Sequence, residues 1–266
     1  MSAILKTIKH PQKFFILGLL LLTACAGGSG IAALPEACNE SSRVETIRLE
    51  ETSRGYSYRF LVYLPPCYQA QSEQPYPLLL LIPGRSSSPD DWLSAGAGQA
   101  LDEAILAGRL PPAIVAVTQN TDSDPHAAVI LQDVLPYVQE HFPVSSERRY
   151  RAVAGGSLGG IAAYRIVFAN PEQFSSAAQF GSGVISGEEP QVKTWLAAMP
   201  AALKPRVFLN CGSEDTLMLK RAEAMASLLY ENDISHVLHI GPGDHSYTYW
   251  VSMFPTYLDW LSEDWQ

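Results

Sequence analysis

Three residues of types that can carry out nucleophilic catalysis lie in the second half of the chain: Ser157, Asp215 and His245. A serine hydroxyl is a weak nucleophile at neutral pH, so it needs a base that accepts its proton. That base in turn needs an acid that orients it and stabilises its charged form. Each of the three residues follows a strand-like segment. The chain therefore has the parts for acyl transfer through a serine-bound intermediate.

Ser157 lies in the run Gly-Gly-Ser-Leu-Gly-Gly at 155–160. A short apolar segment precedes this run, and apolar residues at helical spacing follow it until Asn170-Pro171. A serine at a tight strand-to-helix turn is typical of a nucleophile elbow, in which glycines allow neighbouring backbones to pass closely. The amide of Leu158, at the helix N-terminus, is then the candidate for the first oxyanion donor. An ordinary glycine-rich turn fits the same pattern.

The order of serine, acid and histidine along the chain is that of α/β-hydrolases among the known triads. For the acid, Glu214 is an alternative to Asp215, and Asp215 precedes a predicted helix that it could simply cap. For the base, His236 and His239 are alternatives, although both lie in or beside a predicted strand. Only His245 lies on a glycine-rich loop that follows both a strand and the acid.

The elements that must position these residues alternate along the chain. Residues 78–82 form a continuous apolar run, which is typical of a strand buried on both faces. The carboxyl ends of parallel strands meet at one edge of a sheet. We therefore expect one α/β domain with a mostly parallel sheet, an N-terminal antiparallel hairpin and helices on both faces. The predicted strands are 44–49, 56–64, 78–82, 113–118, 150–154, 174–180, 206–211 and 235–240, and the main predicted helices are 98–106, 128–141, 158–169, 216–230 and 247–261, with a small cap in 184–201.

Loops at the same edge of the predicted sheet hold further candidates for oxyanion donors and for substrate binding. The Arg85 amide, in the polar loop after residue 82, is the candidate for the second oxyanion donor. Trp92 either lines the substrate pocket or packs in the core. Gln119 begins a polar loop at the carboxyl end of the predicted strand 113–118 and is a candidate for substrate binding. That loop also holds Asp122, Asp124 and His126, which we interpret as a solvated turn rather than a metal site.

The chain has 266 residues, 47% of them hydrophobic and 17% charged, as expected for a globular domain. Its net charge of −9 argues against nucleic acid as a partner. Residues 1–24 have a basic start and a short apolar stretch, which predicts an export signal. The sequence Leu22-Thr23-Ala24-Cys25 resembles the lipobox of bacterial lipoproteins. By that resemblance Cys25 carries a lipid that anchors the protein to a membrane outside the cytoplasm. The small residues that follow predict a flexible tether over 25–37, and 38–266 form the predicted domain. An ordinary cleaved signal or an uncleaved anchor remains an alternative.

Export permits disulfide bonds. The predicted hairpin has its turn near residues 52–55, so it pairs residues whose numbers add to about 105. Cys38 and Cys67 meet this condition, and we predict that they form a disulfide. Cys211 ends an apolar strand and is predicted to be a buried small residue.

Several stretches resemble the esterase family of α/β-hydrolases that includes esterase D, S-formylglutathione hydrolases, enterochelin esterases, feruloyl esterases and mycolyltransferases. They are 63–68, 133–143, the elbow 151–160, 170–174, Gly181-Ser182-Gly183, the acid turn 212–215, and 243–247 with Trp250. The resemblance implies that Ser157 is the nucleophile, Asp215 the acid and His245 the base. Ser182 becomes a candidate for substrate binding. Arg85 follows Pro-Gly where the family usually has His-Gly or Asp-Gly, and Ser246 replaces a common acidic residue.

We therefore expect a serine esterase that hydrolyses a small-molecule carboxylic ester through an acyl-enzyme, with no cofactor and no metal. Acyl transfer to an alcohol or sugar by the same triad is one alternative. A non-catalytic surface binding protein on a hydrolase scaffold is another. The sequence does not identify the ester.

Overall fold

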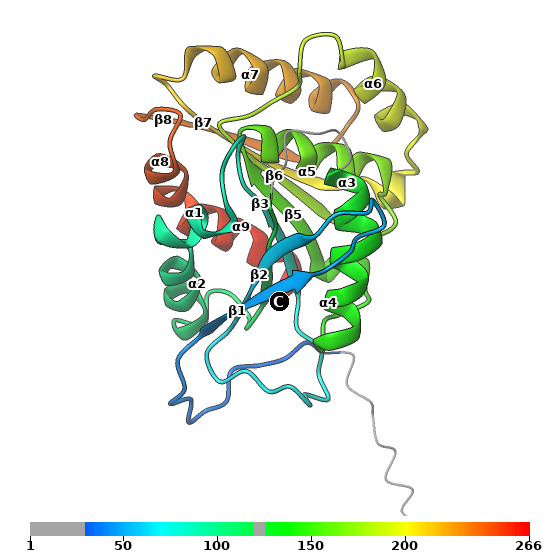
Figure 1. The fold of residues 1–266 in the computed structure, drawn as a ribbon. Helices are drawn as coiled ribbons and strands as arrows, with labels where there is room; N and C mark the ends of the chain where they lie inside the picture. The colour runs from blue at the N-terminus through cyan, green and yellow to red at the C-terminus, as the bar shows by residue number, and fades with distance from the viewer. Residues whose placement is uncertain (1–29, 120–125) are drawn as a thin grey trace, which may run out of the picture.

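A computed structural model of the chain describes residues 30–119 and 126–266. Within them, one eight-stranded sheet has the order β1-β2-β4-β3-β5-β6-β7-β8 and carries helices on both faces (Figure 1). The β1–β2 and β2–β4 pairs are antiparallel, and the other pairs are parallel. The strands are β1 (Arg43–Leu49), β2 (Tyr58–Leu64), β3 (Leu78–Ile82), β4 (Ile114–Val117), β5 (Arg151–Gly156), β6 (Ser176–Phe180), β7 (Arg206–Gly212) and β8 (His236–Gly241).

The two faces of the sheet are covered by different helices, which bury two separate apolar clusters (Figure 1). One face carries α3 (His126–Val129), η1 (Ile130–Val134), α4 (Leu135–His141), α5 (Leu158–Ala169), α6 (Glu189–Ala198) and α7 (Thr216–Glu231). The other carries α1 (Pro89–Ser94), α2 (Ala97–Leu106), α8 (Tyr247–Ser252) and α9 (Phe254–Trp265). Two short 3-10 turns are η2 (Arg148–Tyr150) and η3 (Ala201–Leu203). The predicted layered α/β architecture is thus confirmed.

The central strands form where apolar runs predicted them. All five residues of β3 are buried, as are all of β5 and β6, because helices cover both faces of these strands. The strands β3, β5, β6, β7 and β8 are parallel neighbours, so their carboxyl ends lie along one edge of the sheet. This edge receives the loops that hold the predicted functional residues.

The predicted disulfide between Cys38 and Cys67 is present, but the hairpin register is not the predicted one. Arg43 pairs with Leu64, so paired residue numbers add to 107 rather than 105. The register shifts because the turn is closed by hydrogen bonds of Thr52, with Gly55 at a φ of 76°. Cys67 lies beyond β2 at a φ of 53°, outside the strand pairing, and there it meets Cys38.

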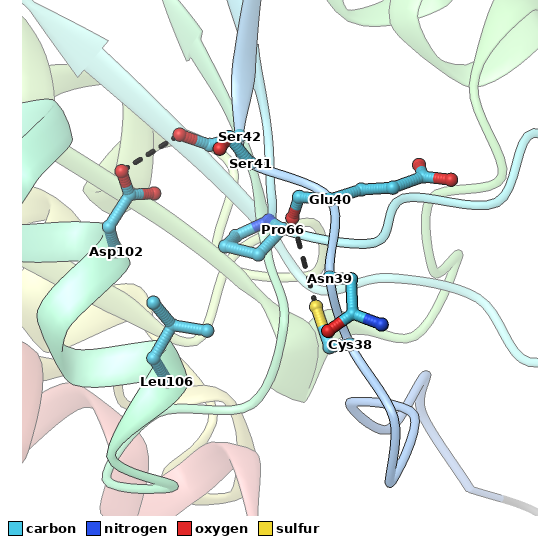
Figure 2. Close-up of a pocket in the computed structure, with 8 residues that line it drawn as sticks. All are labelled: Cys38, Asn39, Glu40, Ser41, Ser42, Pro66, Asp102 and Leu106. Carbon is cyan, nitrogen blue, oxygen red and sulfur yellow. Dashed lines mark hydrogen bonds between the residues drawn. The ribbon is translucent and has the colours of Figure 1, made fainter.

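A carboxylate ties this end of the hairpin to α2. Ser42 and Asp102 line a pocket together with Cys38 (Figure 2), and this pocket has a volume of about 230 Å³. The Ser42 hydroxyl donates to Asp102 Oδ2 at 2.8 Å, and the Tyr63 hydroxyl donates to Oδ1 at 2.7 Å. Burial, together with this hydrogen bond, raises the pKa of Tyr63. The disulfide and Asp102 therefore fasten the hairpin at the edge of the sheet opposite to the loops after β5, β7 and β8.

Two predicted helices are interrupted by proline. The predicted helix 128–141 begins at His126 and widens into a π turn, because Pro136 has no amide to donate and the Leu135 amide instead donates to Ile130 O. The predicted helix 247–261 is divided at Met253 into α8 and α9, since Pro255 occupies the first turn of α9. In the region of the predicted cap, α6 packs against α5 and α7.

The predicted signal segment 1–24 and Cys25 lie outside the described residues. Part of the predicted tether is described, and its Ala32 is buried and donates its amide to Pro75 O at 2.9 Å. Ile31 and Leu34 are also partly buried against an apolar cluster, so this part of the predicted tether packs on the domain. Among the helices of the described residues, none has the length and apolar character that crossing a membrane requires.

Candidate active site

Ser157 is the single residue between the end of β5 and the start of α5, and its backbone is strained. Its φ of 52° and ψ of −118° place a non-glycine residue in a sparsely populated region, which costs about 1–3 kcal/mol. The Ser157 amide donates to Phe180 O, the last residue of β6, at 2.8 Å. A Cβ on Gly155 would overlap the Gly159 backbone, so the turn can close only with glycine there. The predicted elbow geometry is what the chain adopts.

The structure brings Ser157, His245 and Asp215 into one hydrogen-bonded chain. His245 Nε2 lies 2.9 Å from Ser157 Oγ, and His245 Nδ1 is hydrogen-bonded to Asp215 Oδ2. The three residues come from the loops after β5, β8 and β7, at the shared edge of the sheet. A serine, an imidazole and a carboxylate in this order can activate the hydroxyl as a nucleophile.

Asp215 combines the two roles that the sequence left as alternatives. Its Oδ1 accepts the Met218 amide at 3.3 Å and caps α7, while its Oδ2 binds the imidazole. Only 9% of its side chain is exposed, whereas the alternative acid Glu214 is exposed to solvent. The Glu214 amide donates to Gly243 O at 3.0 Å, which joins the acid turn to the histidine turn through the backbone.

The alternative histidines are engaged elsewhere. His236 Nδ1 lies 2.8 Å from Ile234 O, and the His239 ring packs on Phe208 with centroids 5.1 Å apart. The His245 ring instead meets the edge of Trp250 at 5.0 Å, with 38% of the side chain exposed. Among the three, only His245 contacts both a serine hydroxyl and a carboxylate.

Two glycines leave room for Trp250, whose ring packs edge-on against the His245 imidazole. A Cβ on Gly156 would fall 2.6 Å from the Trp250 ring, and one on Gly181 would fall 2.6 Å from the indole nitrogen. A Cβ on Gly181 would also lie 3.1 Å from His245 Nδ1, and the φ of Gly181 is 53°. In the sequence, Gly181 and Trp250 stand out only as members of motifs, and nothing there indicates that they contact His245. Their roles depend on contacts between distant segments, which the residue pattern within one segment does not reveal.

The two predicted oxyanion donors belong to segments that adjoin Ser157. Leu158 is the first residue of α5, where a helix amide has no carbonyl one turn back to accept it. Gly84, which precedes Arg85, lies against the elbow: a Cβ there would be 3.5 Å from Ser157 Cβ. Both amides remain predicted oxyanion donors.

Of the three predicted substrate-binding side chains, two are buried and the third is half-buried. Trp92 is 0% exposed and packs against Phe180 and Tyr247, so its role is packing rather than lining a pocket. Ser182 is also buried, at 1% exposure, because it packs against Gly160 of α5. Gln119 is half-buried, and its Oε1 accepts the Arg59 amide at 3.4 Å, so the side chain turns toward β2.

Charged groups that could bind a metal do not cluster in the described residues: none of their His, Cys, Asp and Glu side chains form a group of three with suitable geometry. Asp122 and Asp124 lie outside the described residues. The thiol of Cys211 is buried as predicted, and burial raises its pKa to about 12.

Comparison with known sequences gives distant relatives. An uncharacterised protein of Corynebacterium glutamicum is 23% identical over 257 residues, covering 80% of this chain and 59% of its own length. An endo-1,4-beta-xylanase/feruloyl esterase of Xylanibacter ruminicola is 25% identical over 188 residues, covering 65% of this chain and 25% of its own. The chain thus spans only part of the length of these two relatives.

Solved structures with the same fold include a ferulic acid esterase, with a TM-score of 0.75 and 18% identity over 86% of this chain and all of the other. An S-formylglutathione hydrolase of Staphylococcus aureus has a TM-score of 0.68 and 17% identity over 88% of this chain and all of its own. These likenesses confirm the predicted α/β-hydrolase fold. The family described as "Putative esterase" matches residues 52–261, which is most of the chain. On that match, and with the elbow and its hydrogen-bonded partners in place, the chain belongs to this esterase family.

Proposed function

We propose that this protein is a serine carboxylic-ester hydrolase that works through an acyl-enzyme. The observation that carries the proposal is the hydrogen-bonded chain from Asp215 through His245 to Ser157 at a strained elbow. Membership of the esterase family supports the reaction class.

In the proposed first half-reaction, Ser157 Oγ attacks the carbonyl carbon of the ester while its proton passes to His245 Nε2. The carbonyl oxygen gains the negative charge and is held by the amides of Leu158 and Arg85. Collapse of this intermediate breaks the bond to the alcohol, which leaves with the proton from His245. Asp215 keeps Nδ1 protonated and stabilises the imidazolium.

In the second half-reaction, water takes the place of the alcohol. His245 accepts a proton from the water as it attacks the acyl carbon, and then returns that proton to Ser157 as the acid is released. The balance of the two halves is one ester and one water converted to one acid and one alcohol. The proton of Ser157 Oγ moves to and from a nitrogen that already lies within hydrogen-bond distance of it, His245 Nε2 at 2.9 Å.

The decisive experiment compares three variants on p-nitrophenyl acetate and with a fluorophosphonate probe. Ser157→Ala should lose at least about 10⁴-fold in kcat and all labelling. Asp215→Asn keeps an oxygen that can cap α7 but turns the wrong group toward His245, so kcat should fall about 10⁴-fold with little loss of stability. Ser186→Ala, at an exposed serine, is the control and should leave both readings unchanged. Near-full activity in Ser157→Ala would overturn the proposal.

The esters to test first are those in the names of similar proteins, feruloyl esters and S-formylglutathione. Product analysis with and without an added alcohol distinguishes hydrolysis from acyl transfer. Accumulation of a new ester in place of the free acid would assign the protein as an acyltransferase that uses the same residues.

We further propose that the protein works outside the cytoplasm, anchored by a lipid on Cys25. The disulfide supports an oxidising compartment, since such bonds are rare in the cytosol. Radiolabelled palmitate should be incorporated into the wild-type protein and not into Cys25→Ser. A mature protein that begins downstream of Cys25 would refute the anchor.

A further inference from the structure

A single side chain joins the segment that bears the proposed base to the loop after β3. Tyr247 follows His245 by two residues and begins α8. Its hydroxyl oxygen accepts the Gly84 amide at 2.9 Å, across 163 residues of sequence. The position of the loop after β3 is therefore coupled to the position of the histidine turn.

Gly84 begins a turn that lies against the elbow. The Ser87 amide donates to Gly84 O at 3.3 Å, and Ser86 has a φ of 56°, as the third residue of a type II turn requires. The far end of the loop is fixed separately, because the Ser88 amide donates to Asp91 Oδ2 at 2.7 Å at the start of α1. Tyr247 thus fixes the end of the turn that is nearest to Ser157.

Among the described residues, the hydrogen bonds of the turn leave the amides of Arg85 and Ser86 available, and Arg85 is the one next to Gly84, which lies against Ser157. Tyr247 takes the Gly84 amide, and Gly84 O takes the Ser87 amide. In the part of the chain that the structure describes, no acceptor is hydrogen-bonded to the Arg85 amide between them. A backbone donor left open beside a nucleophile is what an oxyanion site needs.

The Tyr247 ring is itself held in place. It meets the Trp92 ring edge-on at 5.2 Å and 90°, and the Trp250 ring at 4.9 Å and 69°. Burial raises the pKa of Tyr247, against the smaller opposite effects of hydrogen bonds with the Ser87 side chain and the Gly84 amide. The hydroxyl therefore stays neutral at physiological pH and remains a fixed acceptor.

We propose that Tyr247 is a positioning residue that holds the turn 84–87 so that the Arg85 amide meets the oxyanion. This inference rests on the proposed ester hydrolysis and deepens it. It gives the otherwise buried Trp92 a function as well, since Trp92 braces the ring that sets the turn. The second oxyanion donor then depends on a residue of the histidine turn rather than on the loop alone.

The experiment uses the full-length protein, p-nitrophenyl acetate, and a benzyl trifluoromethyl ketone that forms a tetrahedral adduct with serine. For Tyr247→Phe we expect kcat, per site titrated with a fluorophosphonate, to fall about 10- to 100-fold, as for a donor displaced rather than deleted. Affinity for the ketone should fall by the same factor, and the pH profile of kcat/KM should keep its shape. Tyr257→Phe, which removes a buried hydroxyl without a partner among the described residues, is the matched control and should change neither.

A double-variant cycle separates positioning from general stability. Arg85→Pro deletes the amide at a turn position that favours proline, so kcat should fall about 100- to 1000-fold. In the Arg85→Pro background, Tyr247→Phe should have little further effect on kcat, because the donor that it positions is gone. A merely structural Tyr247 would lower kcat equally in both backgrounds.

Full kcat in Tyr247→Phe, equal losses in the two backgrounds, or full activity in Arg85→Pro would each overturn the inference. The last test does not depend on whether Tyr247→Phe folds. If Ser157→Ala also kept its activity, the proposed function would fail; if only Ser157→Ala were inactive, the hydrolase would stand and this inference alone would fall.

Discussion

Replacing Gly181 with alanine should damage both stability and catalysis, for separable reasons. The residue has a φ of 53°, and an alanine in left-handed backbone costs about 1–2 kcal/mol. Its methyl group would also fall 2.6 Å from the Trp250 indole nitrogen, and Trp250 is 3% exposed and backed by Gly156. Overpacking of this kind costs about 1–3 kcal/mol. The total, about 2–5 kcal/mol, should lower Tm by roughly 4–20 °C.

The effect of Gly181→Ala on activity follows from the second contact of the same methyl group. Its position lies 3.1 Å from His245 Nδ1, the atom that binds Asp215, so the imidazole must move by several tenths of an ångström. Misplacement approaching 1 Å can cost about 100-fold in rate. We therefore expect kcat on p-nitrophenyl acetate to fall about 10- to 100-fold, measured well below the lowered Tm.

Gly108→Ala is the matched control. Gly108 has a φ of 68°, but a Cβ there would meet nothing within 4 Å. This variant should show the backbone strain alone, with Tm lower by roughly 2–8 °C and kcat unchanged. If Gly181→Ala lost no more activity than Gly108→Ala, the inference that Gly181 clears space for the imidazole would be wrong.

Three further predictions concern stability and thiol chemistry. Replacing both Cys38 and Cys67 with serine removes a cross-link over 29 residues, so urea unfolding should show a loss of about 3–4 kcal/mol; kcat at the opposite edge of the sheet should not change. Burial raises the pKa of Tyr257 above its ordinary 10.0, so the unfolded chain loses this proton first and the free energy of unfolding falls as the pH rises above 10. In Tyr257→Phe, urea unfolding between pH 10.5 and 11.5 should show a decrease that is smaller by about 1.4 kcal/mol per pH unit. A slope equal to that of the wild-type protein would refute this prediction. Cys211, whose pKa burial raises to about 12, should react with iodoacetamide at pH 8 only after denaturation, as mass spectrometry would show.

Patterns that one segment carries by itself led to correct predictions from the sequence. The five apolar residues of β3 and the glycine run around Ser157 define a buried strand and an elbow without reference to the rest of the chain. The order of the strands then brings Asp215 and His245 to the same edge, because parallel strands share a direction. The choice of Asp215 over Glu214 needed a family resemblance, since both residues occupy the same turn.

Features set by contacts between distant segments were not predictable in the same way. Trp92 is buried because Tyr247, Trp250 and Phe254 cover it, and these residues lie more than 150 positions further along the chain. The hairpin register depended on which residues of a polar turn close it, and a shift of two residues leaves the alternation of faces intact. The break in the predicted helix 247–261, by contrast, could have been predicted from the sequence, because Pro255 lies within it.

The order β3-β5-β6-β7-β8 explains why small residues gather at this edge. Ser157 and Asp215 follow strands separated by β6, so the His245 ring must reach over the end of β6 to touch both. A Cβ at residue 181 would lie 2.6 Å from the Trp250 indole nitrogen and 3.1 Å from His245 Nδ1, and Gly181 has none. Tyr247 then extends from the same turn back across the elbow to the loop after β3. The glycine after β6 and the tyrosine at α8 are thus two consequences of one constraint: the proposed base follows the edge strand β8, whereas Ser157 follows β5, three strands away, and the loop after β3 is four strands away.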